Sequence, residues 1–354
     1  MLSLLDYESL PLEQVFERIR SVQAKLGKDL LILGHHYQRD EVIQFADARG
    51  DSLELSRIAA EARDARHIVF CGVDFMAETA AMLCAPYQTV YLPAMAAVCP
   101  MAQMTDAPDA RIAWRRLTAL WSDDLIPVTY QNSYAAVKAF CGQKGGAVCT
   151  SANAQAILRW ALDQKGHVLF MPDEHLGRNS ALAIGVAKDQ VAVWDPAQTK
   201  DSLAMARGAK VVVWKGYCHV HTFFTAQHVE QVRLQYPGIT VVVHPECPTP
   251  VVDRADLSGS TSYIMRVVEQ APAGSAFAIG TEIHLVERLA KEHPDKTVVP
   301  LARSRCGTMY RINPYNLCYT LERLAAGEAV NVVRVEPRIA HWANRALKRM
   351  LEVK

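Results

Sequence analysis

The chain has 354 residues, of which 50% are hydrophobic, and it carries 38 Lys and Arg against 37 Asp and Glu. This composition excludes a disordered or fibrous protein, and the length suits two or three domains or one large α/β enzyme. The net charge of +1 provides no global attraction for nucleic acid or an anionic membrane, so any affinity for anionic ligands must be built locally.

The sequence gives no sign of a membrane span or a secretory signal. Its apolar runs are far shorter than the roughly 18 residues needed to cross a bilayer. The first residues contain neither a basic region nor a long apolar core. We therefore expect no signal peptide and a cytoplasmic protein.

Amphipathic helices are predicted over residues 11–26 and 337–354, where apolar residues recur at helical spacing. Between them lie short, continuous runs rich in Val, Ile and Leu, which are typical of strands buried on both faces. The runs are 29–33, 67–73, 89–92, 127–130, 167–171, 191–194, 209–214, 240–243, 276–279 and 297–301. Helical stretches such as 53–62, 154–162 and 262–269 separate them. This alternation predicts an α/β fold with parallel sheets covered by helices.

Many of the predicted strands end abruptly in a polar cluster. The clusters begin at Gly34, Tyr130, Pro172, Lys215, His244 and Gly280. In parallel α/β sheets the ligand-binding crevice lies beyond the carboxyl ends of the strands. The repeated clusters therefore indicate a ligand site rather than a set of solvated loops.

Three of the clusters are followed by a hydroxyl at a predicted helix start. The pairs are His35 with Ser52, Asn132 with Ser151, and His244 with Ser260, at separations of 17, 19 and 16 residues. A helix N-terminus attracts anions, and a hydroxyl there adds a donor. One such serine is ordinarily an N-cap, but three in step with three polar clusters favour an anion site. Asp51 and Glu54 also fit a capping box, which supports a helix beginning at that point.

The cysteines are nine, an odd number, and include no Cys-x-x-Cys pair. This pattern disfavours a disulfide framework and excludes zinc ribbons, thioredoxin motifs and clustered ferredoxin ligands. Two interpretations remain open. Most cysteines are small core residues, as expected for Cys71, Cys84 and Cys318, or a few distant ones converge on a metal or cluster.

One cysteine follows each of the three hydroxyls. The three are Cys99, Cys218 and Cys306, at 47, 67 and 46 residues beyond the hydroxyls. Three units of about 100 residues thus each supply a polar strand end, a hydroxyl and a cysteine. This spacing suggests a threefold internal repeat.

Eight ordered motifs, such as Leu-Gly-His-His-Tyr-Gln and Val-His-Pro-Glu-Cys, resemble those of the quinolinate synthase family. They lie at 33–38, 50–55, 72–80, 130–133, 149–153, 172–179, 243–247 and 259–262, within a resemblance that runs from about residue 29 to about residue 325. The resemblance implies three similar three-layer αβα domains with short parallel sheets, in a pseudo-threefold arrangement around a central active site. The implied domains are 1–110 with about 305–354, then 111–220, then 221–304.

Members of this family condense iminoaspartate (iminosuccinate) with dihydroxyacetone phosphate to give quinolinate, phosphate and water in the de novo biosynthesis of NAD. The resemblance implies the same transferase activity here. It further implies a [4Fe–4S] cluster whose open iron acts as a Lewis acid. The implied partners are these small-molecule substrates and an L-aspartate oxidase that supplies iminoaspartate, with no nucleic acid and no membrane.

The resemblance also assigns residues position by position. The cluster ligands become Cys99, Cys218 and Cys306, with Cys318 as the less favoured alternative to the third. The substrate-binding residues become His35, Ser52, Tyr130, Asn132, Ser151, His244, Glu246, Ser260 and Thr261. The catalytic residues become Glu246 as general base, Tyr37 as acid/base, and His35. For Glu246 the alternative is a salt bridge with an Arg or Lys.

One departure from the family concerns the third cysteine. Arg303, Ser304 and Arg305 precede Cys306, so the Cys-x-x-Cys found in one branch of the family, and with it a local disulfide switch, is excluded.

Two other functions compete with this interpretation. A zinc hydrolase would use the histidines at 35–36 and 219–221 together with Asp173 or His175. A non-catalytic binding module for a phosphorylated or dicarboxylate metabolite would keep the hydroxyls but would have no use for three converging cysteines.

Overall fold

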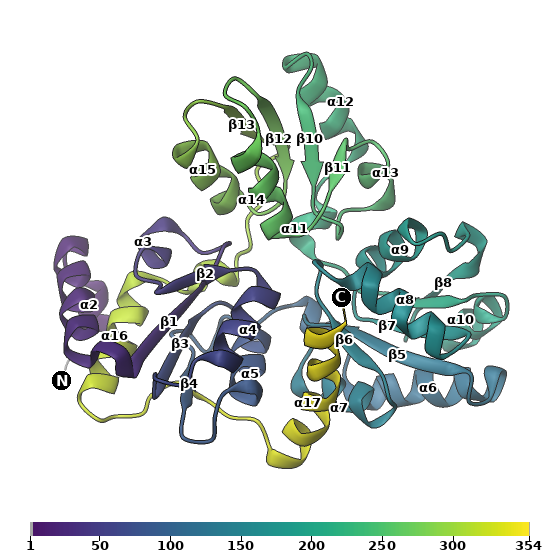
Figure 1. Cartoon of the computed structure of the whole chain (residues 1–354), viewed down its shortest axis with the longest axis horizontal. Coiled ribbons are helices and arrows are strands. Elements are labelled where there is room, and N and C mark those ends of the chain that lie inside the picture. The colour runs from purple at the N-terminus through teal and green to yellow at the C-terminus, as the bar shows by residue number, and fades with distance from the viewer. Residues whose placement is uncertain (1–2, 354) are drawn as a thin grey trace. The chain divides into compact units, whose positions relative to one another are not determined.

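The computed structural model describes residues 3–353 and consists of three short β-sheets with interleaved helices (Figure 1). This architecture confirms the predicted α/β class and agrees with three-layer αβα domains. By its internal contacts the chain divides into two units. The first comprises the residues up to Cys99 together with Arg305–Val335, and the second comprises Pro100–Ser304 together with the residues from Glu336 onwards. The three predicted domain boundaries stay a prediction.

The first unit contains one sheet, with the strand order β14-β4-β3-β1-β2. Its strands are β1 (Leu30–His35), β2 (Ala48–Gly50), β3 (His67–Cys71), β4 (Thr89–Tyr91) and β14 (Val332–Val333). Neighbouring strands are parallel except β14, which runs antiparallel to β4. Ile32 and Val69 at the centre of the sheet are fully buried, as expected for strands covered on both faces.

Helices cover this sheet on both faces (Figure 1). They are α1 (Leu4–Glu8), α2 (Leu12–Leu26), α3 (Asp40–Ile43), α4 (Ser52–Glu61), α5 (Asp74–Leu83) and α16 (Pro314–Ala325), with short 3₁₀ turns at Gly27–Asp29 and Met309–Arg311. The amphipathic helix α2 buries Val15, Ile19 and Val22 and packs on α16. It ends at Gly27, whose positive φ of 51° suits a residue without a Cβ.

The second unit contains the other two sheets, with strand orders β6-β5-β7-β9-β8 and β11-β10-β12-β13, all parallel. The strands of the five-stranded sheet are β5 (Leu125–Tyr130), β6 (Ala147–Cys149), β7 (His167–Met171), β8 (Val191–Trp194) and β9 (Val211–Trp214). Those of the four-stranded sheet are β10 (Thr240–Val243), β11 (Leu257–Ser258), β12 (Ala276–Gly280) and β13 (Thr297–Pro300).

The helices of the second unit connect these strands. They are α6 (Ala107–Trp121), α7 (Ala135–Gln143), α8 (Ala154–Gln164), α9 (Glu174–Ala183), α10 (Thr199–Ala206), α11 (His219–Thr222), α12 (Ala226–Gln235), α13 (Thr249–Val252), α14 (Thr261–Gln270), α15 (Ile283–Glu292) and α17 (Pro337–Glu352), with 3₁₀ turns at Met101–Met104 and Lys188–Gln190. Within residues 3–353, no helix is long and apolar enough to cross a membrane.

The three sheets share one strand order. In each sheet the second strand along the chain is at the edge and is followed across the sheet by the first and then the third. The next position is taken by β4, β9 and β13, and the five-stranded sheet of the second unit adds β8 beyond β9. This repeated order agrees with the threefold pattern read from the sequence.

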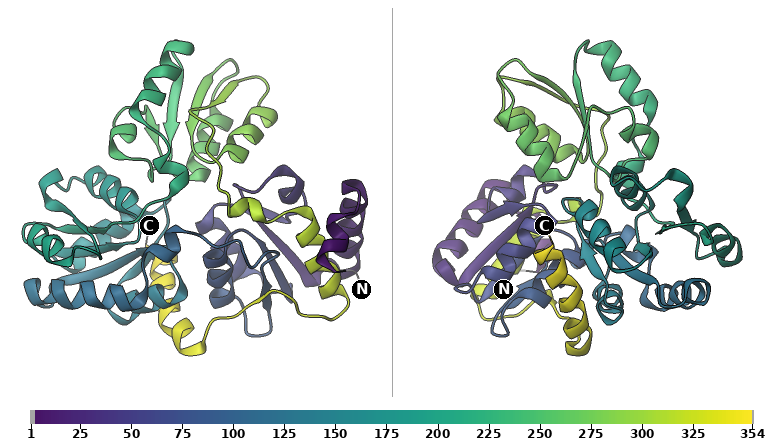
Figure 2. Two further views of the ribbon diagram at one scale, coloured as in Figure 1. Left: turned by 180° about the vertical axis from the view of Figure 1, so that it is seen from behind. Right: turned by 45° about the vertical axis from the view of Figure 1, so that its right-hand side comes forward.

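The last helix, α17, packs on α7 and β6 (Figure 2, yellow beside blue). The approach is close at Gly142, where a Cβ would lie 1.9 Å from the carbonyl oxygen of Trp342. The contact-based division therefore places α17 in the second unit, whereas the sequence prediction grouped 305–354 with the first domain. An amphipathic pattern shows that a helix needs a partner but does not identify which partner it packs on.

Candidate active site

Each sheet brings one hydroxyl to its polar strand end in the same way. The last residue of the first strand is paired with a residue of the short edge strand. These pairs are His35 with Gly50, Tyr130 with Cys149, and Val243 with Ser258. The predicted hydroxyls, Ser52, Ser151 and Ser260, each lie two residues beyond the second member of the pair. The register of β2, β6 and β11 thus places each hydroxyl beside the polar cluster of the adjacent strand.

The three hydroxyls differ in their local roles. Ser52 is the first residue of α4, and the N-cap is Asp51, which forms the predicted capping box with Glu54. Ser151 lies two residues before the N-cap of α8. Ser260 is itself the N-cap of α14 and accepts from a backbone N–H at 3.3 Å. The hydroxyls of Ser52 and Ser151 are therefore not used for capping.

In the first unit, the loop after β1 holds two predicted residues together. His35 is 4% exposed, and its ring centroid lies 4.7 Å from that of Tyr37 in an edge-on contact. The backbone N–H of Tyr37 donates to His35 Nδ1 at 3.1 Å. When the ring is neutral, its proton is therefore on Nε2.

The same loop is joined to the segment that follows Cys306. Gln38 Nε2 donates to the backbone carbonyl of Met309 at 3.4 Å. The guanidinium groups of Arg39 and Arg305 lie 3.4 Å and 4.4 Å from the ring centroid of Tyr310. These cation–π contacts fix the segment that carries the third predicted cysteine.

Cys99 and Cys306 both belong to the first unit and are partly exposed. The backbone N–H of Cys99 donates to Asp74 Oδ1 at 3.1 Å, and the same oxygen accepts from Phe75 N at the start of α5. Cys306 Sγ lies 3.5 Å from Thr308 Oγ1. Both thiols are therefore carried by segments with defined backbone or hydroxyl contacts.

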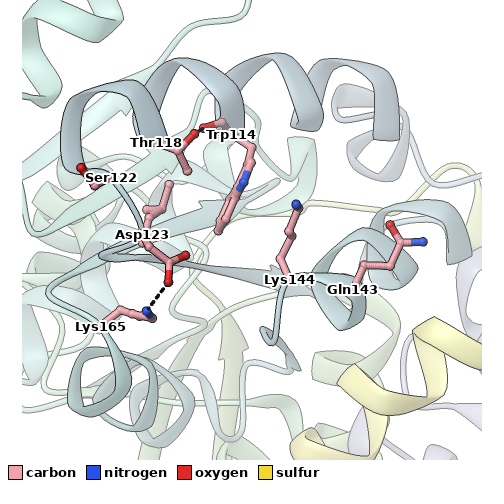
Figure 3. A pocket seen from close by; sticks show the side chains of 8 residues that line it. Trp114, Thr118, Ser122, Asp123, Gln143, Lys144 and Lys165 are labelled. Carbon is pink, nitrogen blue, oxygen red and sulfur yellow. Dashed lines mark hydrogen bonds and ion pairs between the residues drawn. The ribbon is translucent and has the colours of Figure 1, made fainter.

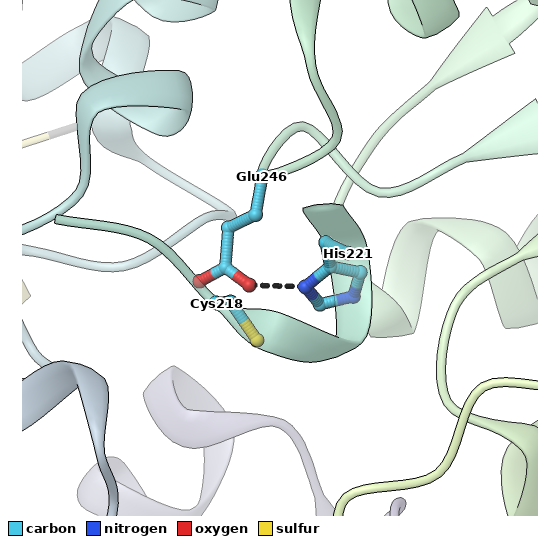
Figure 4. Close-up of side chains that lie close together, drawn as sticks. All are labelled: Cys218, His221 and Glu246. Carbon is cyan, nitrogen blue, oxygen red and sulfur yellow. Dashed lines mark ion pairs between the residues drawn. The ribbon is translucent and has the colours of Figure 1, made fainter. Parts of the chain in front are cut away.

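In the second unit, three side chains with metal-binding donors meet at the carboxyl ends of the strands (Figure 4). Cys218 lies at the N-cap of α11, His221 lies on α11, and Glu246 follows β10. A thiol, an imidazole nitrogen and a carboxylate oxygen from these residues lie within 4.8 Å of one another. Sulfur, nitrogen and oxygen are donors that suit iron or zinc, so these residues fit a metal centre.

Histidines, rather than an Arg or Lys, lie against the carboxylate of Glu246. Its Oε2 contacts His221 Nδ1 and lies 3.6 Å from His244 Nδ1. The two imidazole rings are stacked, with centroids 4.3 Å apart and planes 14° from parallel. All three side chains are at most 2% exposed, so the group is shielded from water.

This environment shifts the pKa values of both Glu246 and His244. Burial raises the pKa of Glu246, but His221, His244 and the hydrogen bonds from His221 and Tyr130 lower it more, to about 2. Burial, together with the neighbouring His221, lowers the pKa of His244 to about 3 despite Glu246. At neutral pH the carboxylate is ionised and His244 is neutral.

A second buried carboxyl group, Asp173, has its pKa shifted in the opposite direction. It is fully buried at the N-cap of α9, where it accepts from Leu176 N at 2.6 Å. Burial and the like charge of Glu246 raise its pKa well above the usual range. Two neighbouring carboxyl groups whose pKa values are pushed apart are typical of catalytic sites.

Several buried polar atoms of this region have no hydrogen-bond partner within residues 3–353. They include Glu246 Oε1, Asp173 Oδ2 and the amide oxygen of Asn132. A buried oxygen without a partner is costly, by about 1–3 kcal/mol each. A bound ligand or metal that supplied the missing partner would relieve this cost.

All of the other cysteines except Cys84 are buried, unlike the three predicted ligands. Cys71 and Cys318 are buried, and burial raises the pKa of each thiol to about 12. Cys84, which we expected in the core, is only partly buried, although burial still raises its pKa. Buried thiols of this kind are core residues rather than metal ligands.

Two open hollows of the second unit, of about 510 and 520 Å³, lie beside the five-stranded sheet and share Trp114 and Lys144. Figure 3 shows the first, where Lys165 pairs with Asp123 at 3.2 Å. Its lining includes residues just before β5 and β7, so it opens at their amino ends, away from the polar clusters.

The function expected from the sequence gave no role to His221 or Asn179. The structure places both beside Glu246 or its loop. His221 had appeared only as a zinc ligand of the competing hydrolase. Its position three residues after Cys218, on the first turn of a helix, was the available signal. Asn179 lay within a recognised motif, but its partners follow a different strand and could not be read from the sequence.

These features define an α/β enzyme with a buried carboxylate, histidines and a thiol at the carboxyl ends of parallel strands. The family model described as quinolinate synthetase A protein (NadA) matches residues 17–352. The quinolinate synthases of Bacillus cereus (strain B4264) and Geobacillus sp. (strain WCH70) are both 48% identical to this chain, over 351 and 348 residues, which cover 98% of this chain and 95% of each relative. The chain belongs to the quinolinate synthase family.

Proposed function

We propose that this protein condenses iminoaspartate (iminosuccinate) with dihydroxyacetone phosphate to form quinolinate, phosphate and water in NAD biosynthesis. One observation carries the proposal. The ionised Glu246 lies buried beside neutral His244 and the partly exposed thiol of Cys218, and one of its oxygens has no partner within residues 3–353. The 48% identity to quinolinate synthases along 98% of the chain supports the assignment.

Cys99, Cys218 and Cys306 are the proposed ligands of a [4Fe–4S] cluster. Their partial exposure supports this role, because a ligand thiol must be reachable by the incoming group and must ionise. When bound through three thiolates, such a cluster has one open iron, which supplies a Lewis acid for the departure of water.

The substrates carry two carboxylates and a phosphate, which a chain of net charge +1 must bind with local donors. Ser52 begins α4, and Ser260 with Thr261 begins α14, so each group combines a hydroxyl with backbone N–H groups at a helix start. Ser151 adds a hydroxyl beside Tyr130 through the register of β5 and β6. These are the proposed anion contacts.

Three further residues are proposed to form hydrogen bonds with the substrates. The buried amide oxygen of Asn132 offers an acceptor to a substrate N–H or O–H. Neutral His244 offers one donor and one acceptor without adding charge. His35, whose Nδ1 accepts from the Tyr37 backbone, offers a donor at Nε2.

Glu246 and Tyr37 are the proposed proton carriers. With a pKa of about 2, Glu246 is ionised but only weakly basic in the empty site. A substrate carboxylate that enters beside it raises its proton affinity, because like charges disfavour the ionised form. Glu246 then accepts a proton during condensation or dehydration, and Tyr37 moves a proton in the keto–aldehyde rearrangement.

Anaerobic purification followed by iron, sulfide and zinc analysis and a quinolinate assay tests the proposal. Iminoaspartate is generated in the assay by an L-aspartate oxidase, and dihydroxyacetone phosphate is added. We expect brown protein with iron and sulfide that forms quinolinate. Colourless protein that contains zinc would instead support a hydrolase. Binding of dihydroxyacetone phosphate or quinolinate without formation of quinolinate would support a binding module.

A further inference from the structure

His221 is a buried histidine to which the proposed chemistry assigns no role. It is 1% exposed, and each of its ring nitrogens lies against an oxygen of another side chain. Nδ1 contacts Oε2 of Glu246, and Nε2 lies 3.1 Å from the hydroxyl oxygen of Thr281. The ring therefore bridges two side chains that come from different strand ends.

The two partners of His221 are fixed by the sheet. Glu246 follows β10, and Thr281 follows β12, which pairs directly with β10. Thr281 is fully buried, and Glu246 is 2% exposed. The backbone N–H of His221 also donates to the carbonyl of Cys218 at 3.1 Å. The imidazole thus connects the loop of the second cysteine with two adjacent strands.

The hydrogen-bond chemistry gives this bridge a direction. An ionised Glu246 can only accept, so Nδ1 of His221 donates to it. In the neutral ring Nε2 is then the acceptor, and the hydroxyl of Thr281 donates to it. The ring of His244 is stacked on that of His221 with planes 14° from parallel, so it covers one face of the His221 ring.

We propose that His221 is a positioning residue that holds the carboxylate of Glu246 in one orientation, and that Thr281 holds His221. Oε2 lies against the imidazole, which leaves Oε1, without a hydrogen-bond partner within residues 3–353, to act on the substrate. This inference rests on the proposed function, because it assumes that Glu246 acts on the substrate.

Two substitutions at His221 separate positioning from packing. His221→Phe keeps an aromatic ring of similar size but removes the donor to Glu246. His221→Asn removes the ring but places an amide N–H close to the former Nδ1. We expect His221→Phe to lower kcat about 100-fold, because a misplaced catalytic group has effects of that size, with KM changed less than about threefold. We expect His221→Asn to recover at least about tenfold of that loss.

Thr281 provides an independent test of the same bridge. Thr281→Val keeps the shape but removes the hydroxyl, and we expect a smaller loss of kcat than for His221→Phe. Thr281→Ser keeps the hydroxyl and is expected to behave like the parent protein. His341→Asn, the same change at an exposed position on α17, is the control and is expected to change neither parameter.

Iron and sulfide content and the affinity for quinolinate, measured by calorimetry on each cluster-loaded variant, complete the test. A positioning role leaves both unchanged in His221→Phe. Loss of iron from that variant would show a ligand role and overturn the inference, and so would full kcat in His221→Phe or no recovery in His221→Asn. Failure of the parent protein to form quinolinate would overturn the proposed function itself.

Discussion

The side-chain amide of Asn179 donates hydrogen bonds to the backbone carbonyls of Pro245 and Cys247, each at 2.8 Å. These are the two residues that flank Glu246. Asn179 lies on α9, and its own carbonyl accepts from Thr249 Oγ1 at 2.8 Å. Because Asn179 is only 7% exposed, these bonds form out of contact with most of the solvent. Helix α9, which follows β7 of the five-stranded sheet, thus holds the loop that carries Glu246 after β10 of the four-stranded sheet.

Asn179→Ala should therefore destabilise the protein and slow it. Three hydrogen bonds are lost, two of them to buried or partly buried backbone carbonyls, so we expect a loss of about 2–3 kcal/mol in the free energy of unfolding. Thr249→Val removes one bond and should lose about 1 kcal/mol. Urea unfolding measures both. Equal losses in the two variants would contradict the view that Asn179 anchors the Glu246 loop.

A second prediction concerns the pH dependence of the first unit. Glu322 on α16 accepts from Arg18 Nε and Nη2 at 2.8 and 2.7 Å, and it also accepts from the hydroxyl of Tyr7. Burial raises the pKa of Glu322, but Arg18 and Tyr7 lower it more, to a net value below the usual 4.5. The group therefore contributes stability above the unfolded pKa and loses it as pH falls through the lowered folded pKa.

Glu322→Gln should accordingly be less stable than the parent at pH 7, by about 1 kcal/mol because Arg18 and Glu322 are partly exposed. The difference should shrink as the pH is lowered from 7 towards 3, because the carboxyl group of the unfolded chain takes up its proton before that of the folded protein does. Denaturant unfolding at both pH values measures it. A difference that stayed constant down to pH 3 would mean that the charge of Glu322 contributes nothing.

The close contact between α7 and α17 gives a third prediction. A Cβ on Gly142 would lie 1.9 Å from the carbonyl oxygen of Trp342, so Gly142→Ala must displace α17. We expect faster amide exchange in α17 and a loss of at least about 2 kcal/mol in stability. Gly208→Ala, whose Cβ would meet nothing within 4 Å, is the matched control. Unchanged exchange in α17 would refute the contact.

A fourth prediction distinguishes ligand cysteines from core cysteines. Single Cys→Ser changes at 99, 218 and 306 should each lower the iron and sulfide content of anaerobically prepared protein severalfold, because a thiolate ligand is lost. Cys318→Ser should keep the full iron content, since Cys318 is a buried core residue. The reverse result at Cys306 and Cys318 would exchange their roles.

The strands that the sequence predicted correctly are mostly the longer ones. Each of the ten apolar runs corresponds to a strand, from β1 to β13. The strands missed, β2, β6, β11 and β14, contain two or three residues at or near sheet edges. An edge strand such as Ala48–Gly50 carries no continuous apolar run, because it needs only one neighbour and little burial.

The candidate site was predictable in its parts but not in its connections. Polar residues after strands identified Glu246 and His244, since such positions are exposed to ligand rather than needed for packing. The bridge through His221 and the anchor at Asn179 depend on which strand ends lie side by side. That information comes from tertiary packing, and no local pattern in the sequence contains it. The convergence of Cys99, Cys218 and Cys306 stays a prediction.

The pairing of α2 with α16 bears on how the protein is made. Helix α2 buries Val15, Ile19 and Val22, and it packs on α16 of the same unit. The ribosome synthesises α16 nearly 300 residues after α2. During synthesis the apolar side of α2 stays exposed until α16 has been made. A nascent chain with such an exposed apolar surface is prone to aggregate. Premature termination before α16 would leave this surface permanently uncovered, so truncated products should depend on chaperones or be degraded.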